Sequence, residues 1–198
     1  MSTKIDRRLL LGQLFAAPAD YLFVSGLAGS ARDLAALTND APTLFALGGV
    51  MGAASMIGLG MALAVPDREV AVVTGDGELQ MNVGSLISIA SAGPPNLTIV
   101  CVDNERHGET GNQPGHTARR TDLGIVARGA GFSSVMTVLR DEEVQSAAKF
   151  IKEAPGPRLI VVKVADTEPS AFKRLMDPAA CRYRFRTAYS ANQARRVS

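Results

Sequence analysis

The chain has 198 residues, of which 46% are hydrophobic and 20% charged, which is enough for one domain with a sizeable core. Its formal net charge of +2 predicts no overall affinity for nucleic acid. Cys101 and Cys181 lack metal-site spacing, and the apolar run after Arg7 and Arg8 is too short for a secretory signal, so we expect a protein of the reducing cytoplasm.

The first third of the chain predicts helices alternating with strands. Apolar side chains at helical spacing indicate an amphipathic helix near the N-terminus, and short apolar runs bounded by turn residues indicate strands. The expected elements, in chain order, are a helix at residues 5–16, a strand at 21–25, a helix at 31–37, a strand at 43–46 and a helix at 53–64.

Residues 41–66 carry no charge and are long enough to span a bilayer. They contain five glycines, however, and lead into another apolar run. We therefore expect a strand, a glycine-rich loop and a buried helix here, and no association with a membrane.

The remaining chain continues the alternation. Residues 70–74 and 97–102 are continuous apolar runs typical of strands buried on both faces, and the helix expected between them, at 79–92, ends before two prolines. Further on, we expect a long loop at 105–121, helices at 123–129 and 141–153, a strand at 158–164 and a solvated basic tail from about residue 182.

Strands alternating with helices predict a three-layer α/β fold, a single domain over residues 1–198 with a mostly parallel central sheet and helices on both faces. Ligands of such sheets bind at the carboxyl ends of the strands. Any functional site is therefore expected where these strands end.

Oxygen-bearing side chains follow two of the predicted strands. Asp76 lies between Gly75 and Gly77 directly after one strand, and Asn104 follows the next strand, one βα unit later. A carboxylate and an amide oxygen suit Mg²⁺, and the flanking glycines allow backbone N–H groups to approach a diphosphate. The alternative is that Asp76 and Asn104 are ordinary turn residues, for which both types are common.

This combination resembles the diphosphate-binding half of thiamine diphosphate enzymes. The family carries Gly-Asp-Gly and, about one βα unit later, usually Asn-Asn. The resemblance covers about residues 21–164 and includes the segments 47–52, 58–64, 96–100 and 108–114. Among subfamilies it is most similar to the β subunit of sulfopyruvate decarboxylase and to the C-terminal half of phosphonopyruvate decarboxylase.

The resemblance implies roles for individual residues. The loop with Gly49, Met51 and Gly52 would cradle the aminopyrimidine, with Met51 holding the cofactor in its bent form; the alternative is that Met51 is core filler. Backbone N–H groups of Gly77 and Glu78 would bind the diphosphate. The implied cofactor-binding residues are Gly49, Met51, Gly52, Gly75, Asp76, Gly77, Glu78 and Asn104, and the implied Mg²⁺ ligands are Asp76, Asn104 and the backbone carbonyl of Arg106.

Two positions depart from the family pattern. Glu78 stands where the family often has serine, so its carboxylate would repel the diphosphate unless the side chain turns away. A place near a helix N-terminus would favour it there. Asp103 replaces the first asparagine of the usual pair, while Asn104, the ligand, is kept.

The resemblance also implies a partner. Thiamine diphosphate enzymes activate the cofactor with a glutamate on a separate pyrimidine-binding domain, for which a chain of 198 residues has no room. We therefore expect a hetero-oligomer with a pyrimidine-binding subunit that decarboxylates a small anionic 2-oxoacid. The candidate catalytic residues on this chain are His107, Glu109 and His116, and the sequence leaves open whether the histidines are only exposed loop residues.

Two other functions remain open. Glu78-Leu79 after the Gly-Asp-Gly motif is also found in transketolases, so the chain could be half of a transketolase-type enzyme or a carboligase. It could also be a non-catalytic cofactor-binding module. Release of an aldehyde and carbon dioxide would distinguish decarboxylation from ketol transfer.

Overall fold

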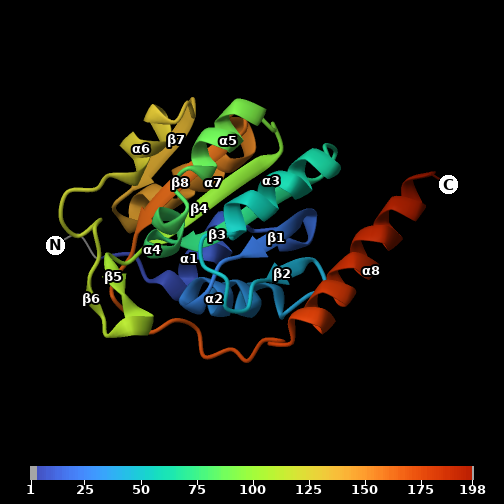
Figure 1. Ribbon diagram of the computed structural model, residues 1–198, viewed down its shortest axis with the longest axis horizontal. Helices are drawn as coiled ribbons and strands as arrows, with labels where there is room; N and C mark the ends of the chain where they lie inside the picture. Colours follow the sequence, from blue (N-terminus) through green and yellow to red (C-terminus); the bar gives the residue numbers. More distant parts are fainter. Residues whose placement is uncertain (1–3, 198) are drawn as a thin grey trace.

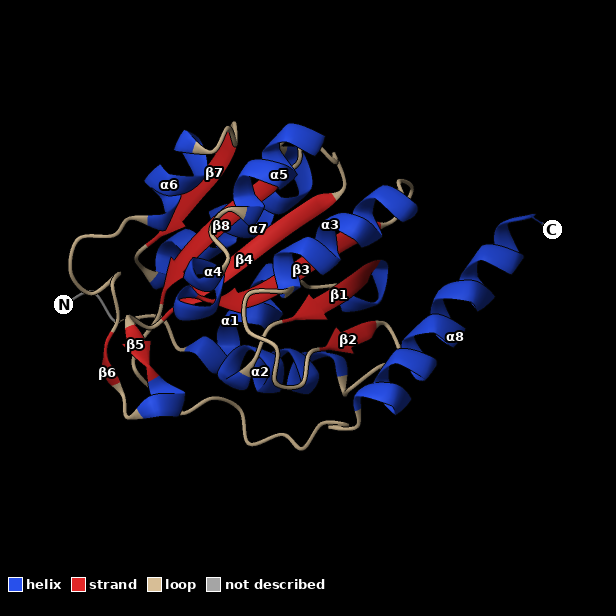
Figure 2. Cartoon of the chain, in the orientation of Figure 1, coloured by secondary structure: helices blue, strands red, loops and turns tan. Residues whose placement is uncertain are grey.

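A six-stranded parallel sheet forms the centre of the molecule in the computed structural model, which describes residues 4–197 and the side chains of residues 4–190. Its strand order is β2-β1-β3-β4-β8-β7, so the chain moves to one side from β1 and then crosses to the other (Figure 2). The strands are β1 (Tyr21–Ser25), β2 (Leu44–Ala46), β3 (Glu69–Gly75), β4 (Leu97–Asp103), β7 (Ser134–Val138) and β8 (Arg158–Lys163).

Helices cover both faces of this sheet (Figure 1). Successive side chains of a strand point to opposite faces, so Ala71 and Val73 of β3 join one hydrophobic cluster while Val70 and Val72 join the other. The first cluster is covered by α1 (Arg7–Leu14), α2 (Ala28–Thr38) and α7 (Val144–Glu153), and the second by α3 (Ala54–Ala64), α4 (Asp76–Met81), α5 (Ser85–Ala92) and α6 (Leu123–Gly129). The predicted three-layer α/β fold is confirmed.

Three local predictions need correction. The single helix expected at 79–92 is interrupted between α4 and α5, where Asn82 donates its side-chain amide to the carbonyl of Gly52, 3.0 Å away. The loop at 105–121 contains a 3₁₀ turn and a small antiparallel hairpin, β5 (Arg106–His107) with β6 (Gln113–Pro114). The sequence predicted no element at β7, an edge strand with a partly exposed face.

The uncharged segment at 41–66 forms β2, a loop and α3, as expected. Within the part of the chain that the structure describes, we find no helix with both the length and the apolar character needed to cross a membrane.

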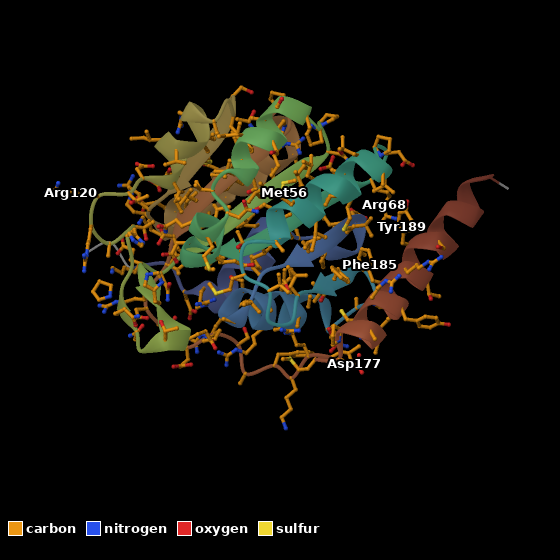
Figure 3. All side chains as sticks on the ribbon, viewed as in Figure 1. Met56, Arg68, Arg120, Asp177, Phe185 and Tyr189 are labelled. Carbon is orange, nitrogen blue, oxygen red and sulfur yellow. The ribbon has the colours of Figure 1, made fainter. Side chains whose placement is uncertain are left out.

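The expected basic tail is instead a helix, α8 (Pro178–Val197). Asp177 accepts hydrogen bonds from the backbone N–H groups of the first turn, and Arg184 forms an ion pair of 3.0 Å with Asp40. Cys181 is buried, and the rings of Phe185 and Phe45 contact each other at a tilt of 60° with their centroids 5.5 Å apart. The helix lies beside β2, and its side chains Phe185 and Tyr189 face α3 (Figure 3).

Two glycines of α3 should respond oppositely to alanine. A Cβ at Gly58 would overlap Val72 on β3, whereas a Cβ at Gly60 meets no atom within 4 Å. We expect Gly58→Ala to lower the free energy of unfolding by about 1–3 kcal/mol through overpacking, and Gly60→Ala to raise it by about 0.5–1 kcal/mol because alanine favours helix. Urea unfolding of both variants measures this, and equal effects would refute the close packing of α3 on β3.

Candidate active site at the carboxyl ends of the strands

Asp76 is buried at the point where β3 ends and α4 begins. The residue is only 2% exposed, and its Oδ2 lies 3.0 Å from the hydroxyl of Thr117. Burial, followed by the nearby charge of Asp103, raises the pKa of Asp76 to about 6, although hydrogen bonds from Thr117 and from backbone N–H groups oppose this. A turn residue facing solvent would have neither feature. The site therefore holds a negative charge that a bound cation would stabilise.

Asn104 lies on the neighbouring strand end. Gly75 of β3 pairs with Val102 of β4, so the residues that follow these two strands emerge side by side. The side-chain oxygen of Asn104 accepts a hydrogen bond of 3.3 Å from the backbone N–H of Arg106, which orients it. Arg106 itself is exposed, and its guanidinium lies 3.6 Å from Asp166.

These oxygen atoms fit a hard cation that completes its coordination elsewhere. Among the described residues, no group of three or more His, Cys, Asp or Glu side chains could hold a metal ion alone. Mg²⁺ needs no such group, because it commonly uses one or two protein carboxylates together with water and substrate phosphates. The donors Asp76 and Asn104 therefore suit Mg²⁺ bound together with a diphosphate.

The side chains of Thr117, Asp103, Lys163 and Glu105 form a charged network next to Asp76. The sequence predicted the position of Asp103 after its strand but none of these contacts. Thr117 Oγ1 also lies 2.8 Å from Asp103 Oδ1, and Lys163 Nζ lies 2.8 Å from both Asp103 Oδ2 and Glu105 Oε1. Burial disfavours the charged form of Lys163, but its contacts with the two carboxylates outweigh this and raise its pKa. Asp103 and Lys163 are paired in the β4–β8 register, which only the sheet order reveals.

Glu78 turns its side chain toward the carboxyl ends of the neighbouring strands β1 and β3, where the strand order reverses. It is 5% exposed, and its Oε2 accepts hydrogen bonds of 3.0 Å from the backbone N–H of Leu27 and from the hydroxyl of Thr74. Burial raises its pKa, while Leu27 and Thr74 partly offset the effect. Glu78 also lies in the first turn of α4, which favours a carboxylate.

The loop between β2 and α3 contains the three residues predicted to contact the aminopyrimidine. Gly49 and Gly52 have φ angles of +87° and +82°, a region that glycine adopts without strain. Met51 is 47% exposed, so it is not core filler. A large apolar side chain on an exposed loop is free to contact a ligand, and the role of Met51 as a support for the cofactor stays a prediction.

The hairpin lies beyond the ends of β3 and β4 (Figure 1), with His107 on β5 and His116 just after β6. The rings of His107 and His116 are 6.0 Å apart, and His107 Nδ1 would lie 3.0 Å from a Cβ at Gly77. Glu109, on the turn of the hairpin, is exposed. The structure thus brings His107 and His116 together and leaves Glu109 farther along the hairpin.

Comparison with known proteins supports the resemblance. The family model for the thiamine pyrophosphate enzyme, C-terminal TPP binding domain, matches residues 30–162. Sulfopyruvate decarboxylase subunit beta of Methanocaldococcus jannaschii is 38% identical over 71% of this chain and 73% of its own length. Phosphonopyruvate decarboxylase of Streptomyces viridochromogenes is 33% identical over 85% of this chain, but this chain spans only 42% of that protein.

Among solved structures, a Mycobacterium smegmatis protein described as a thiamin diphosphate-dependent enzyme superposes with a TM-score of 0.72. The match covers 84% of this chain and 33% of that one, and at 21% identity it bears on the fold alone. Together with the sequence relatives, it confirms the similarity that the Gly-Asp-Gly motif and Asn104 predicted.

Proposed function

Because the chain belongs to the family of C-terminal TPP-binding domains of thiamine pyrophosphate enzymes, we propose that it is the diphosphate- and Mg²⁺-binding subunit of a 2-oxoacid decarboxylase. The substrate would be of the sulfopyruvate or phosphonopyruvate type, as the names of its relatives suggest. The observation that carries the proposal is the buried carboxylate of Asp76 beside Asn104 at adjacent strand ends.

Each part of the site has a task in this proposal. Asp76, Asn104 and the backbone carbonyl of Arg106 hold Mg²⁺, and the backbone around Gly75, Gly77 and Glu78 receives the diphosphate. The loop with Gly49, Met51 and Gly52 holds the aminopyrimidine. When bound, thiamine diphosphate supplies an electron sink for the loss of carbon dioxide from the substrate.

The hairpin would act on the substrate itself. His107 and His116 carry imidazole nitrogens that can donate or accept hydrogen bonds, so either side chain would transfer a proton to or from the substrate or bind the anionic head group of a 2-oxoacid. Glu109 is the third candidate. The arrangement of the two rings, 6.0 Å apart, supports a shared task for the histidines.

The proposal includes a partner and a place of action. A pyrimidine-binding subunit would supply the activating glutamate, and the cofactor would lie between the two chains in a cytoplasmic hetero-oligomer. The subunit names of three sulfopyruvate decarboxylase relatives support a partner of this kind. Substrate selection would then depend on residues of both chains.

Reconstitution with the pyrimidine-binding subunit tests this function. We expect the mixture, given thiamine diphosphate and Mg²⁺, to convert sulfopyruvate or phosphonopyruvate to carbon dioxide and the matching aldehyde, and either chain alone to be inactive. Asp141→Ala, on the exposed turn that follows the edge strand β7, serves as a control that we expect to keep activity. An acyloin product would favour a carboligase instead, and no turnover with any 2-oxoacid would refute the decarboxylase assignment.

A further inference from the structure

Thr117 occupies an unusual position between two carboxylates. Only 8% of this residue is exposed, and its hydroxyl oxygen lies 3.0 Å from Asp76 Oδ2 and 2.8 Å from Asp103 Oδ1. A hydroxyl carries one proton and can donate it to one acceptor at a time. Both carboxylates therefore compete for the same proton of Thr117.

The surroundings of Asp103 decide this competition. Its Oδ1 also accepts a hydrogen bond of 2.9 Å from the backbone N–H of Glu105, and its Oδ2 forms an ion pair of 2.8 Å with Lys163. The charge of Asp103 is thus compensated without the help of Thr117. Among the described residues, no cationic side chain forms an ion pair with Asp76. The proton of the Thr117 hydroxyl is therefore available to Asp76.

The backbone fixes Thr117 in this place. Gly115, two residues earlier, donates its N–H to the carbonyl of Glu105 at 2.8 Å, and a Cβ there would lie 3.2 Å from Asp76 Oδ2. Lys163 also donates to the carbonyl of Thr117 at 3.4 Å. The end of the hairpin is therefore anchored against both β3 and β8.

From this geometry we infer that Thr117 is a positioning residue for the metal site: its backbone is anchored by Lys163, and its hydroxyl donates to the carboxylate of Asp76 and orients it toward the cation. The inference rests on the proposed function, because it assigns to Asp76 the role of metal ligand. Groups that hydrogen-bond to metal ligands typically change metal affinity by about 10- to 100-fold when they are removed.

The test compares two substitutions of Thr117 with a distant control. Thr117→Val removes the hydroxyl at nearly constant volume, and Thr117→Ser keeps it. Thr38→Val makes the same change on α2, where the hydroxyl donates to the carbonyl of Leu34 at 2.9 Å. Binding of Mn²⁺, as a probe for Mg²⁺, is measured on the full chain with thiamine diphosphate by electron paramagnetic resonance, with and without the pyrimidine-binding subunit.

We expect Thr117→Val to weaken Mn²⁺ binding by about 10- to 100-fold, while Thr117→Ser and Thr38→Val stay within about 3-fold of the wild type. Thermal unfolding without metal shows whether Thr117→Val folds; if it does not, Thr117→Ala replaces it, and affinity equal to that of Thr117→Ser overturns the inference. Unchanged affinity of a folded Thr117→Val also overturns it. A wild type that binds no Mn²⁺ refutes the proposed function, and the inference with it.

Discussion

Asp76→Asn is expected to make the metal-free protein more stable at pH 8 while removing its response to Mg²⁺. The unfolded chain releases the Asp76 proton near pH 3.8, whereas the folded chain releases it near pH 6, because burial and Asp103 disfavour the charge. The folded state therefore binds more protons between these values, so stability falls as pH rises through this window, and the full cost is present above it.

The size of this effect follows from the shift. A difference of about two pKa units corresponds to at most about 3 kcal/mol, which Asp76→Asn should recover at pH 8 and not below about pH 4. Urea unfolding in EDTA measures it, with Asp141→Asn as the exposed control. With thiamine diphosphate and Mg²⁺ at 100 times the dissociation constant, the wild type should instead gain about 2.7 kcal/mol and the variant nothing.

An Asp76→Asn protein that is no more stable than the wild type at pH 8 would contradict the conclusion that Asp76 carries an uncompensated charge in the metal-free protein. So would an advantage that persists unchanged at pH 4. Equal stabilisation of both proteins by Mg²⁺ and thiamine diphosphate would show that Asp76 does not bind the metal.

Lys163→Met should destabilise the fold by about 3 kcal/mol, because it leaves the carboxylate of Asp103, which is 1% exposed, without its cation. Adding Asp103→Asn to this variant should recover about 2 kcal/mol, since the amide oxygen can still accept from the backbone N–H of Glu105 but carries no charge. The neutral asparagine that the family usually has in place of Asp103 would then replace most of the stability that the Asp103–Lys163 pair provides.

Urea unfolding of the two single variants and the double variant gives this comparison. Lys149→Met is the matched control, because Lys149 forms an exposed helical ion pair of 3.8 Å with Glu153 and should change stability by less than about 0.5 kcal/mol. A double variant that is less stable than Lys163→Met alone would show that Lys163 does not act through the charge of Asp103.

The parts of the site predicted from sequence are those that local chain order determines. Asp76 and Asn104 follow apolar strands directly, so their place at one edge of a parallel sheet required only the alternation of elements. Lys163 is 59 residues downstream of Asn104, and its contact with Asp103 depends on β8 pairing with β4, which no local pattern determines. Thr117 was hidden for the same reason, within a loop whose fold depends on the sheet below it.

The C-terminal helix shows a different limit. Cys181, Phe185 and Tyr189 are spaced by four residues, which is a helical pattern, but the arginines between them suggested a solvated tail. In the structure the apolar side faces the core while Arg184 reaches Asp40. Tertiary contacts, which composition does not reveal, thus stabilise a packed helix here instead of a solvated tail.

The most direct test of the account is calorimetric titration of the chain with thiamine diphosphate, in Mg²⁺ and in EDTA, alone and with the pyrimidine-binding subunit. We predict binding that requires Mg²⁺, tightens with the partner and disappears in Asp76→Ala. Binding that is equally tight in EDTA or in Asp76→Ala, or no binding even with the partner present, would contradict the assignment of this site.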